Sequence, residues 1–389
     1  MKILLKFLCL LICLAPLVIK AQEDEEEDYD VVVFSTLMGD VIDNVGQERI
    51  DAVDVALASF DNPNTYQPDH LSIPSLYFFK ARELTFQGKY EEALELAQTI
   101  KDVSPTIVSS FLPNARQYAY SMGYVTEGFV NWIKKDIPLA KTYYDSALQY
   151  FPDGFYANFF LGWIAQNEKE NQKAIEYYTK AENGVTVIKF DWAEMYYKKG
   201  VVFHGMKLYS QAAEAYTKSI EKFPLCMAFF ERGRVYYYSS AYQDKSIAYD
   251  DFRDVIANCP NYDKLGQANS FVAVDYHGKR NYQQALKHYK KAYELIGSPF
   301  DAAGAGSVYY NLQDWNNSIL WRTKAIDAAQ KDPRTTKATL GEYYYWRAMS
   351  FTGLKRWGNA ASDLRKARSL GDRKAADYLN KNAAFFSKY

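Results

Sequence analysis

The sequence predicts an all-α fold built from repeated helical hairpins, and three observations lead to this prediction. Eight segments of the 389-residue chain resemble one another, from GKYEEALELAQTIKDVSP at 88–105 to RWGNAASDLRKARSL at 356–370. Each segment has a small residue at the same place, which we call the anchor. In four segments the second helix is expected to end at a proline, which cannot continue a helix: Pro105, Pro152, Pro224 and Pro260. The anchors are Ala93, Ala140, Ala174, Ala212, Ala248, Ala285, Ser318 and Ala360.

A second small residue lies twelve positions before seven of the eight anchors. Small side chains at both places let two helices of a hairpin approach closely, as ridges-into-grooves packing requires. These residues are Ala81, Gly128, Gly162, Gly200, Ala273, Gly306 and Ala348. In the fifth segment the corresponding Gly233 requires a turn three residues longer.

Aromatic rings recur four positions after the anchor, where they would pack against the next hairpin. The rings are Tyr144, Tyr178, Tyr216, Phe252 and Tyr289, and Arg322 takes this place in the seventh segment. Much of the content of 34 Tyr is therefore expected in the core.

This pattern resembles the tetratricopeptide repeat, a helix–turn–helix unit of ~34 residues. The resemblance covers residues 75–370 and implies a right-handed superhelical solenoid of about eight repeats. The first helix of each repeat (the A helix) would line its concave side, and the second (the B helix) would lie outside. Residues 22–74 would form an acidic leader and an N-terminal helical cap, with a helix at Gln47–Phe60, and residues 371–389 a C-terminal capping helix.

The N-terminus is typical of a secretory signal peptide at residues 1–21. Lys2 and Lys6 precede an apolar stretch at 7–19, and Ala21 is a small residue suited to cleavage. The apolar stretch is shorter than the ~20 residues that span a bilayer, so a retained signal anchor is the less favoured alternative. We expect an exported protein, periplasmic or extracellular, with no integral membrane segment after cleavage.

The charge balance argues against nucleic-acid binding. The chain carries 46 basic and 47 acidic residues, and the balance falls to −4 without the three lysines of the signal peptide. A nucleic-acid-binding protein normally needs a basic face. The four His are scattered, and no zinc, phosphate-loop or nucleophile motif is present. We therefore predict a non-enzymatic protein with no metal and no cofactor.

The resemblance places the binding surface on the A helices. The family's groove positions hold aromatic rings and Arg, which are enriched in binding hot spots. These positions are Phe78, Arg82, Phe129, Trp132, Tyr156, Phe159, Trp163, Tyr197, His204, Phe230, Arg234, Tyr237, His277, Tyr310 and Tyr345. We expect a scaffold that binds a peptide or partner protein, centred on Trp163, Tyr197, His204 and Arg234. Binding of a small ligand such as a glycan is the alternative.

Cys226 and Cys259 are the cysteines that remain after signal cleavage. They lie at the start of the fifth A helix and the end of its B helix, which are neighbouring ends of one antiparallel hairpin. An oxidising compartment permits a disulfide. Helix axes stand 8–10 Å apart, whereas bridged Cα atoms lie within ~7 Å. A disulfide and two buried free thiols therefore both remain open.

Overall fold

The computed structural model describes residues 46–60, 72–109, 112–184 and 189–389 of the chain. It divides into two compact units, unit 1 up to Phe223 and unit 2 from Pro224 onward. Every regular element in these residues is a helix, which confirms the predicted all-α repeat fold. The predicted signal peptide and the acidic run that follows it lie outside the described residues.

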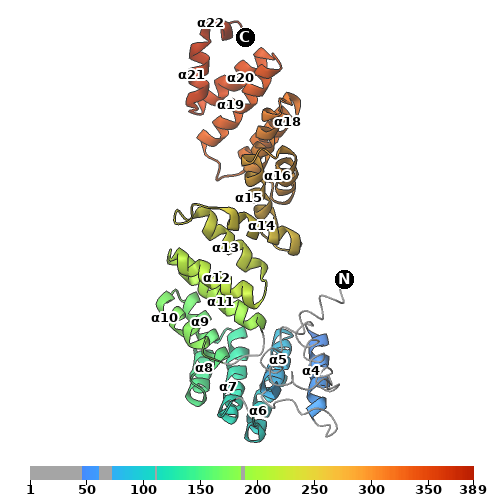
Figure 1. Ribbon diagram of the computed structural model, residues 1–389, viewed down its shortest axis with the longest axis vertical. Coiled ribbons are helices and arrows are strands. Elements are labelled where there is room, and N and C mark those ends of the chain that lie inside the picture. Colours follow the sequence, from blue (N-terminus) through green and yellow to red (C-terminus); the bar gives the residue numbers. More distant parts are fainter. Residues whose placement is uncertain (1–45, 61–71, 110–111, 185–188) are drawn as a thin grey trace, which may run out of the picture. The chain divides into compact units, whose positions relative to one another are not determined.

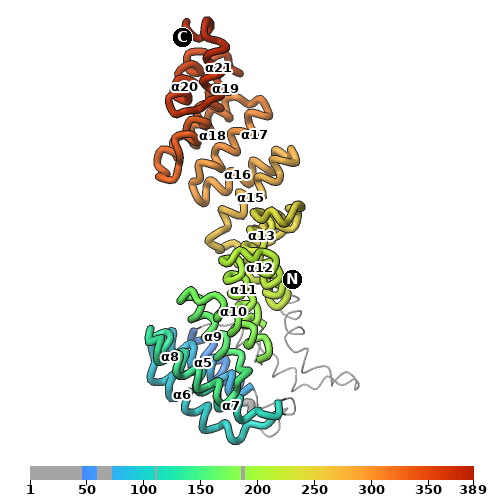
Figure 2. The backbone as a smooth tube through the Cα atoms, turned by 90° about the vertical axis from the view of Figure 1, so that its left-hand side faces the viewer, coloured from blue at the N-terminus to red at the C-terminus, as the bar shows by residue number. Residues whose placement is uncertain are grey.

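The described part of each unit contains four helical hairpins, and Figures 1 and 2 show how their helices follow one another. In unit 1 the hairpins are α5 (Ser72–Phe86) with α6 (Tyr90–Val103), α7 (Ala115–Ile133) with α8 (Ile137–Tyr150), α9 (Phe155–Asn167) with α10 (Asn171–Ala181), and α11 (Lys189–Gly205) with α12 (Tyr209–Lys222). In unit 2 they are α13 (Cys226–Tyr238) with α14 (Ser246–Asn258), α15 (Leu265–Gly278) with α16 (Tyr282–Ile296), α17 (Pro299–Asn311) with α18 (Trp315–Lys331), and α19 (Lys337–Gly353) with α20 (Trp357–Ser369).

Further helices adjoin the hairpins in both units. In unit 1, α4 (Gln47–Phe60) packs on α5 and has the bounds that the spacing of apolar residues predicts. A single 3-10 turn, Ser104–Thr106, follows α6. In unit 2, α21 (Arg373–Lys381) packs on α20 and leads into α22 (Ala383–Phe386).

Seven of the eight described hairpins turn through three residues, and the middle residue of each turn is left-handed. This conformation disfavours residues with a Cβ atom, yet only the first turn has a glycine there. The middle residues are Gly88, Lys135, Lys169, Lys207, Arg280, Gln313 and Lys355, with φ between 57° and 79°. The next residue closes the turn, as where Glu170 N donates to Ala165 O at 2.9 Å.

The fifth hairpin has the longer turn that the sequence predicts, at residues 239–245. The Lys245 ammonium group holds this turn together. Its Nζ donates to the backbone carbonyls of Tyr236, Ser239 and Tyr242 at 2.9, 3.0 and 2.5 Å. The carbonyls of Tyr236 and Tyr242 thereby gain a donor, and that of Ser239, which also accepts from Tyr242 N at 3.4 Å, gains a second one.

All eight anchors are fully buried, as close packing of the A and B helices requires. In the second, third and fourth hairpins, the ring four positions after the anchor lies directly on the small residue of the A helix. An ideal Cβ atom added to Gly128, Gly162 or Gly200 would lie only 2.6 to 2.7 Å from a ring carbon of Tyr144, Tyr178 or Tyr216. These three Tyr are also fully buried, so the ring and the missing side chain are complementary features of one contact.

Candidate functional site

The structure places five of the predicted groove residues in the core, so they are not available to a partner. Phe78, Phe129, Tyr156, Phe159 and Phe230 are each at most 3% exposed. In unit 1 the cause is the close approach of three A helices. The Phe78 ring of α5 lies 4.9 Å from that of Tyr156 on α9 and 6.0 Å from that of Phe129 on α7, between ring centroids. Phe230 is covered within unit 2 by Phe252 and Tyr262, at 5.7 and 5.8 Å.

Arg82 has a structural partner in the same region. Its Nη1 lies 3.8 Å from Oδ1 of Asp191 on α11, and the Tyr156 hydroxyl donates to Oδ2 of the same carboxylate at 2.7 Å. Burial raises the pKa of Asp191, while Arg82 and the Tyr156 hydrogen bond lower it. Arg82 therefore offsets a buried carboxylate and links the first A helix of unit 1 to the fourth.

Two of the predicted residues, Trp132 and Trp163, form a half-buried surface together with Lys198. The two indole rings are 4.5 Å apart between centroids at an interplanar angle of 61°. Lys198 Nζ lies 3.4 Å from the centroid of the Trp163 ring, a cation–π contact. We call these three residues the aromatic–lysine array. They come from α7, α9 and α11, so the array crosses three consecutive A helices.

The charge of Lys198 is balanced by Glu194, one turn earlier on α11. Their Nζ and Oε1 atoms are 3.8 Å apart. Burial lowers the pKa of Lys198 and Glu194 raises it, and burial raises the pKa of Glu194 against the lowering effect of Lys198. Sequence reasoning missed both residues because it sought aromatic rings and Arg. Glu194 nevertheless occupies a groove position of the family, because it lies as far before its anchor in the fourth repeat as Tyr156 does in the third.

Apolar surface lies close to the array on the preceding A helix. Phe86, the last residue of α5, is 60% exposed, and its ring lies edge-on to Phe129 at 5.7 Å. The predicted Tyr197 and His204 are half-buried on α11, where their rings lie 5.9 Å from those of Tyr216 and Tyr209 on α12. These two residues are thus directed partly toward their own hairpin.

In unit 2 the other predicted residues are half-buried. Arg234 forms an ion pair with Glu231 at 2.9 Å. Tyr237 on α13 lies 4.8 Å from Phe271 on α15, ring to ring. Arg234 belongs to unit 2, whereas Trp163 belongs to unit 1.

The remaining three predicted residues lie on later A helices of unit 2. A hydrogen bond of 3.1 Å joins His277 Nε2 on α15 to Asn311 Nδ2 on α17. Burial, followed by the charge of Arg322, lowers the pKa of His277. Tyr310 on α17 and Tyr345 on α19 both pack against Trp346, at 5.5 and 5.3 Å between ring centroids.

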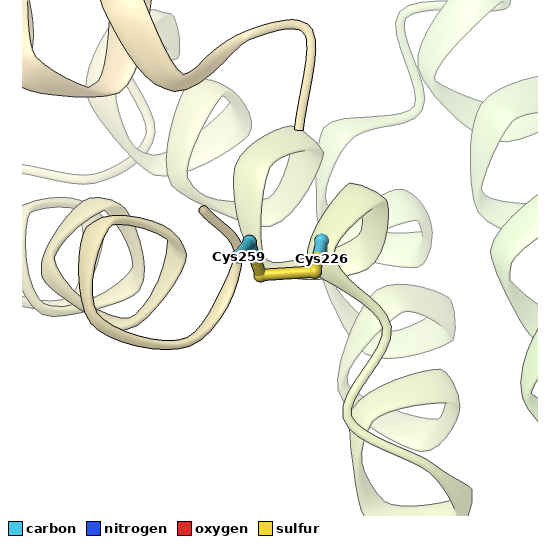
Figure 3. The surroundings of a disulfide bond; sticks show 2 residues. All are labelled: Cys226 and Cys259. Atoms are coloured by element: carbon cyan, nitrogen blue, oxygen red, sulfur yellow. A yellow bond between two sulfur atoms is a disulfide. The ribbon is translucent and has the colours of Figure 1, made fainter. Parts of the chain in front are cut away.

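Cys226 and Cys259 form a disulfide in the structure, as Figure 3 shows. Their Cα atoms are 6.0 Å apart, closer than packed helix axes. Cys226 is the first residue of α13, while Cys259 follows α14 with φ −126° and ψ 61°. Since the backbone has left the helix at Cys259, the spacing of the helix axes does not limit the distance between the two residues.

The described residues contain neither a metal-binding cluster nor a membrane-spanning helix. No group of three or more His, Cys, Asp or Glu side chains there could hold a metal ion. No helix there has both the length and the apolar character needed to cross a membrane.

The geometry defines the class of protein as a helical-hairpin repeat array. Residues 135–184 and 193–221 each match a family model described as tetratricopeptide repeat. With eight hairpins in the described residues, this chain is a tetratricopeptide repeat protein.

Three similar solved structures are those of the MamA protein, of the C-terminal part of a tetratricopeptide repeat-containing protein from Cytophaga hutchinsonii, and of a tetratricopeptide repeat protein from Parabacteroides merdae. Their identities to this chain are 14%, 19% and 16%, with TM-scores of 0.39, 0.38 and 0.39. The alignments cover 50%, 70% and 68% of this chain, and 96%, 96% and 98% of the other. No curated protein is found to match this chain.

Proposed function

We propose that this protein is an exported scaffold that binds a peptide or a partner protein on the A-helix face of unit 1. Tetratricopeptide repeats support a role in protein interaction in general. The observation that carries the specific proposal is the aromatic–lysine array, with Trp132, Trp163 and Lys198 on three consecutive A helices and the exposed Phe86 nearby.

The chemistry of the array suits a protein partner. Two adjoining indole rings offer apolar area that loses little conformational entropy on binding, since each side chain has only two torsions. Lys198 and Glu194 supply a donor and an acceptor at the border of the rings. An apolar centre beside polar groups is the usual anatomy of a protein interface.

Binding can be tested with matched variants of the whole chain. The wild type is used as bait in extracts of the native source, and the captured protein is then titrated against each variant. Trp163→Ala should weaken binding by about 2 kcal/mol, a typical hot-spot effect. Tyr150→Ala is the control, because Tyr150 is an aromatic residue on the B helix α8 that is 43% exposed. Binding that survives Trp163→Ala but not Tyr150→Ala would place the interface on the opposite face.

Export is supported by two independent features. Residues 1–21 have the pattern of a secretory signal peptide, and the Cys226–Cys259 disulfide is of the kind that persists in oxidising compartments. We expect the mature chain of the native protein to begin near Gln22 or Glu23. N-terminal sequencing tests this, and an intact Met1 would refute it.

A further inference from the structure

Arg322 occupies a place that is filled by a ring in other repeats. It lies on α18, four residues after the anchor Ser318, where the third repeat has Tyr178. Its A helix keeps the small residue that faces such a ring, since a Cβ atom added to Gly306 would lie 3.0 Å from Arg322 Cγ. Arg322 is only 4% exposed. A charged group is therefore buried at a position where an aromatic ring would pack.

The guanidinium group of Arg322 has no carboxylate partner among the described residues. Nη2 donates to Ser307 Oγ at 2.5 Å, and the guanidinium carbon lies 5.8 Å from the centroid of the Trp346 ring. Nε is buried without a hydrogen-bond partner. Burial lowers the pKa of Arg322 to about 10, so the group still carries its charge at neutral pH.

Two other arginines of unit 2 show what this site lacks. Arg232 donates through Nε and Nη2 to Asp251 at 3.0 and 2.7 Å. Arg347 donates through the same two atoms to Asp363 at 2.7 and 2.9 Å. Both side chains are more exposed than that of Arg322. The most buried of the three is therefore the one without a counter-ion.

Polar groups of three A helices surround the charge. The charge of Arg322 lowers the pKa of His277 on α15. Tyr310 on α17 and Tyr343 on α19 in turn raise the pKa of Arg322, against the larger effect of burial. The carboxylate of Glu342 also raises the pKa of Arg322, but Glu342 is exposed and its side chain is directed toward other residues. Its Oε1 accepts a long hydrogen bond from Trp346 Nε1 at 3.4 Å and lies 3.6 Å from Lys374 Nζ.

We propose that Arg322 is the binding site for one carboxylate of a partner peptide, which inserts between α17 and α19 and supplies the missing counter-ion. A guanidinium group matches a carboxylate through two parallel donors. One unpaired positive charge matches one negative charge, which favours a carboxylate over a doubly charged phosphate. This site is separate from the aromatic–lysine array, so either proposal can fail without the other.

The test observes the arginine Nε–H resonances of the whole chain by nuclear magnetic resonance. Sodium acetate is the first probe and sodium chloride at equal ionic strength its control. We expect acetate to shift the Arg322 resonance saturably. The resonances of Arg232 and Arg347 are internal controls that should not move, because their carboxylate partners are already in place.

Peptides then distinguish the source of the carboxylate. Tri-alanine with a free C-terminus presents a terminal carboxylate, and acetyl-Ala-Glu-Ala-amide presents a side-chain carboxylate. A shift with either supports the site and identifies its source. Arg322→Lys should weaken the binding of that peptide at least about tenfold, because an ammonium group cannot donate in parallel.

A second variant separates binding from folding. Arg322→Tyr restores the ring of the other repeats, so it should fold at least as stably as the wild type and bind no carboxylate. Sodium phosphate is added as a further probe. Three results would overturn the proposal: no saturable shift with acetate or either peptide, equal shifts of all three arginines, or a saturable shift with phosphate alone.

Discussion

The contact between Gly162 and Tyr178 provides a sharp test of how each hairpin packs. A Cβ atom at position 162 would lie 2.7 Å from Tyr178 Cε1 and 2.8 Å from Cδ1. Carbon atoms in contact are normally about 3.5–4.0 Å apart. The Tyr178 ring is fully buried, and its hydroxyl donates to Gln166 Oε1 at 2.7 Å, so it has no free space into which to move. We therefore expect Gly162→Ala to destabilise unit 1.

Two opposing effects set the size of the change. Alanine is a better helix former than glycine by about 1 kcal/mol. Overpacking of a filled core typically costs ~1–3 kcal/mol, and a contact shorter than normal by nearly 1 Å belongs at the upper end. The expected net loss in the free energy of unfolding is about 2 kcal/mol. Gly205→Ala should instead be neutral or stabilising, because no atom lies within 4 Å of that Cβ position on α11.

Urea unfolding followed by far-UV circular dichroism measures both variants against the wild type. A second arm places Gly162→Ala in a Tyr178→Leu background, where the shorter side chain should remove most of the penalty. If Gly162→Ala is as stable as the wild type, or if the penalty persists without the ring, the contact does not govern the packing of the hairpin.

Three further predictions concern unit 2. Burial raises the pKa of Asp301 to about 6, against hydrogen bonds from Ser270 and Ser298, so the folded chain holds a proton that the unfolded chain releases near pH 4. The free energy of unfolding of the chain should therefore fall by up to about 3 kcal/mol as the pH rises from 4 to 6. Asp301→Asn should remove most of this dependence on pH, which urea unfolding at a series of pH values measures. The disulfide predicts no reactive thiol in the denatured mature chain, and its removal with Cys226→Ser and Cys259→Ser should cost about 3–4 kcal/mol for a sequence separation of 33 residues. Lys245→Met removes the ammonium donor shared by three carbonyls and should destabilise unit 2 by ~1–3 kcal/mol in thermal melting, whereas the exposed Lys287→Met should not.

The repeat fold could be predicted because its determinants are local in sequence. The anchor, the small residue twelve positions earlier and the ring four positions later belong to one hairpin, and their contacts follow from helix geometry alone. The longer fifth turn could be predicted in the same way, from the spacing of Gly233 and Ala248. What holds that turn is the Lys245 ammonium group, and no sequence pattern indicated it.

The binding surface could be predicted only in part, because its exposure depends on how tightly successive repeats wind. Phe78 and Trp163 satisfy the same family rule, yet the first is fully buried and the second half-buried. The difference arises from contacts between repeats that are far apart in the chain, such as that of Phe78 with Tyr156. A repeat pattern describes each hairpin and its neighbour but not the approach of α5 to α9.

The tight winding of unit 1 also bears on how a partner could bind there. A strip of rings along all four A helices would suit an extended peptide of any register, but the interior of that strip is filled by Phe78, Phe129, Tyr156 and Phe159. Among the predicted groove residues in the described part of unit 1, ring surface is left at the half-buried Tyr197 and His204 of α11 and at the aromatic–lysine array. A partner that binds there meets a short apolar patch bordered by Lys198 and Glu194, and its specificity must come from a few contacts. The loss of one indole ring, as in Trp163→Ala, should therefore weaken binding far more than it would along a continuous strip of rings.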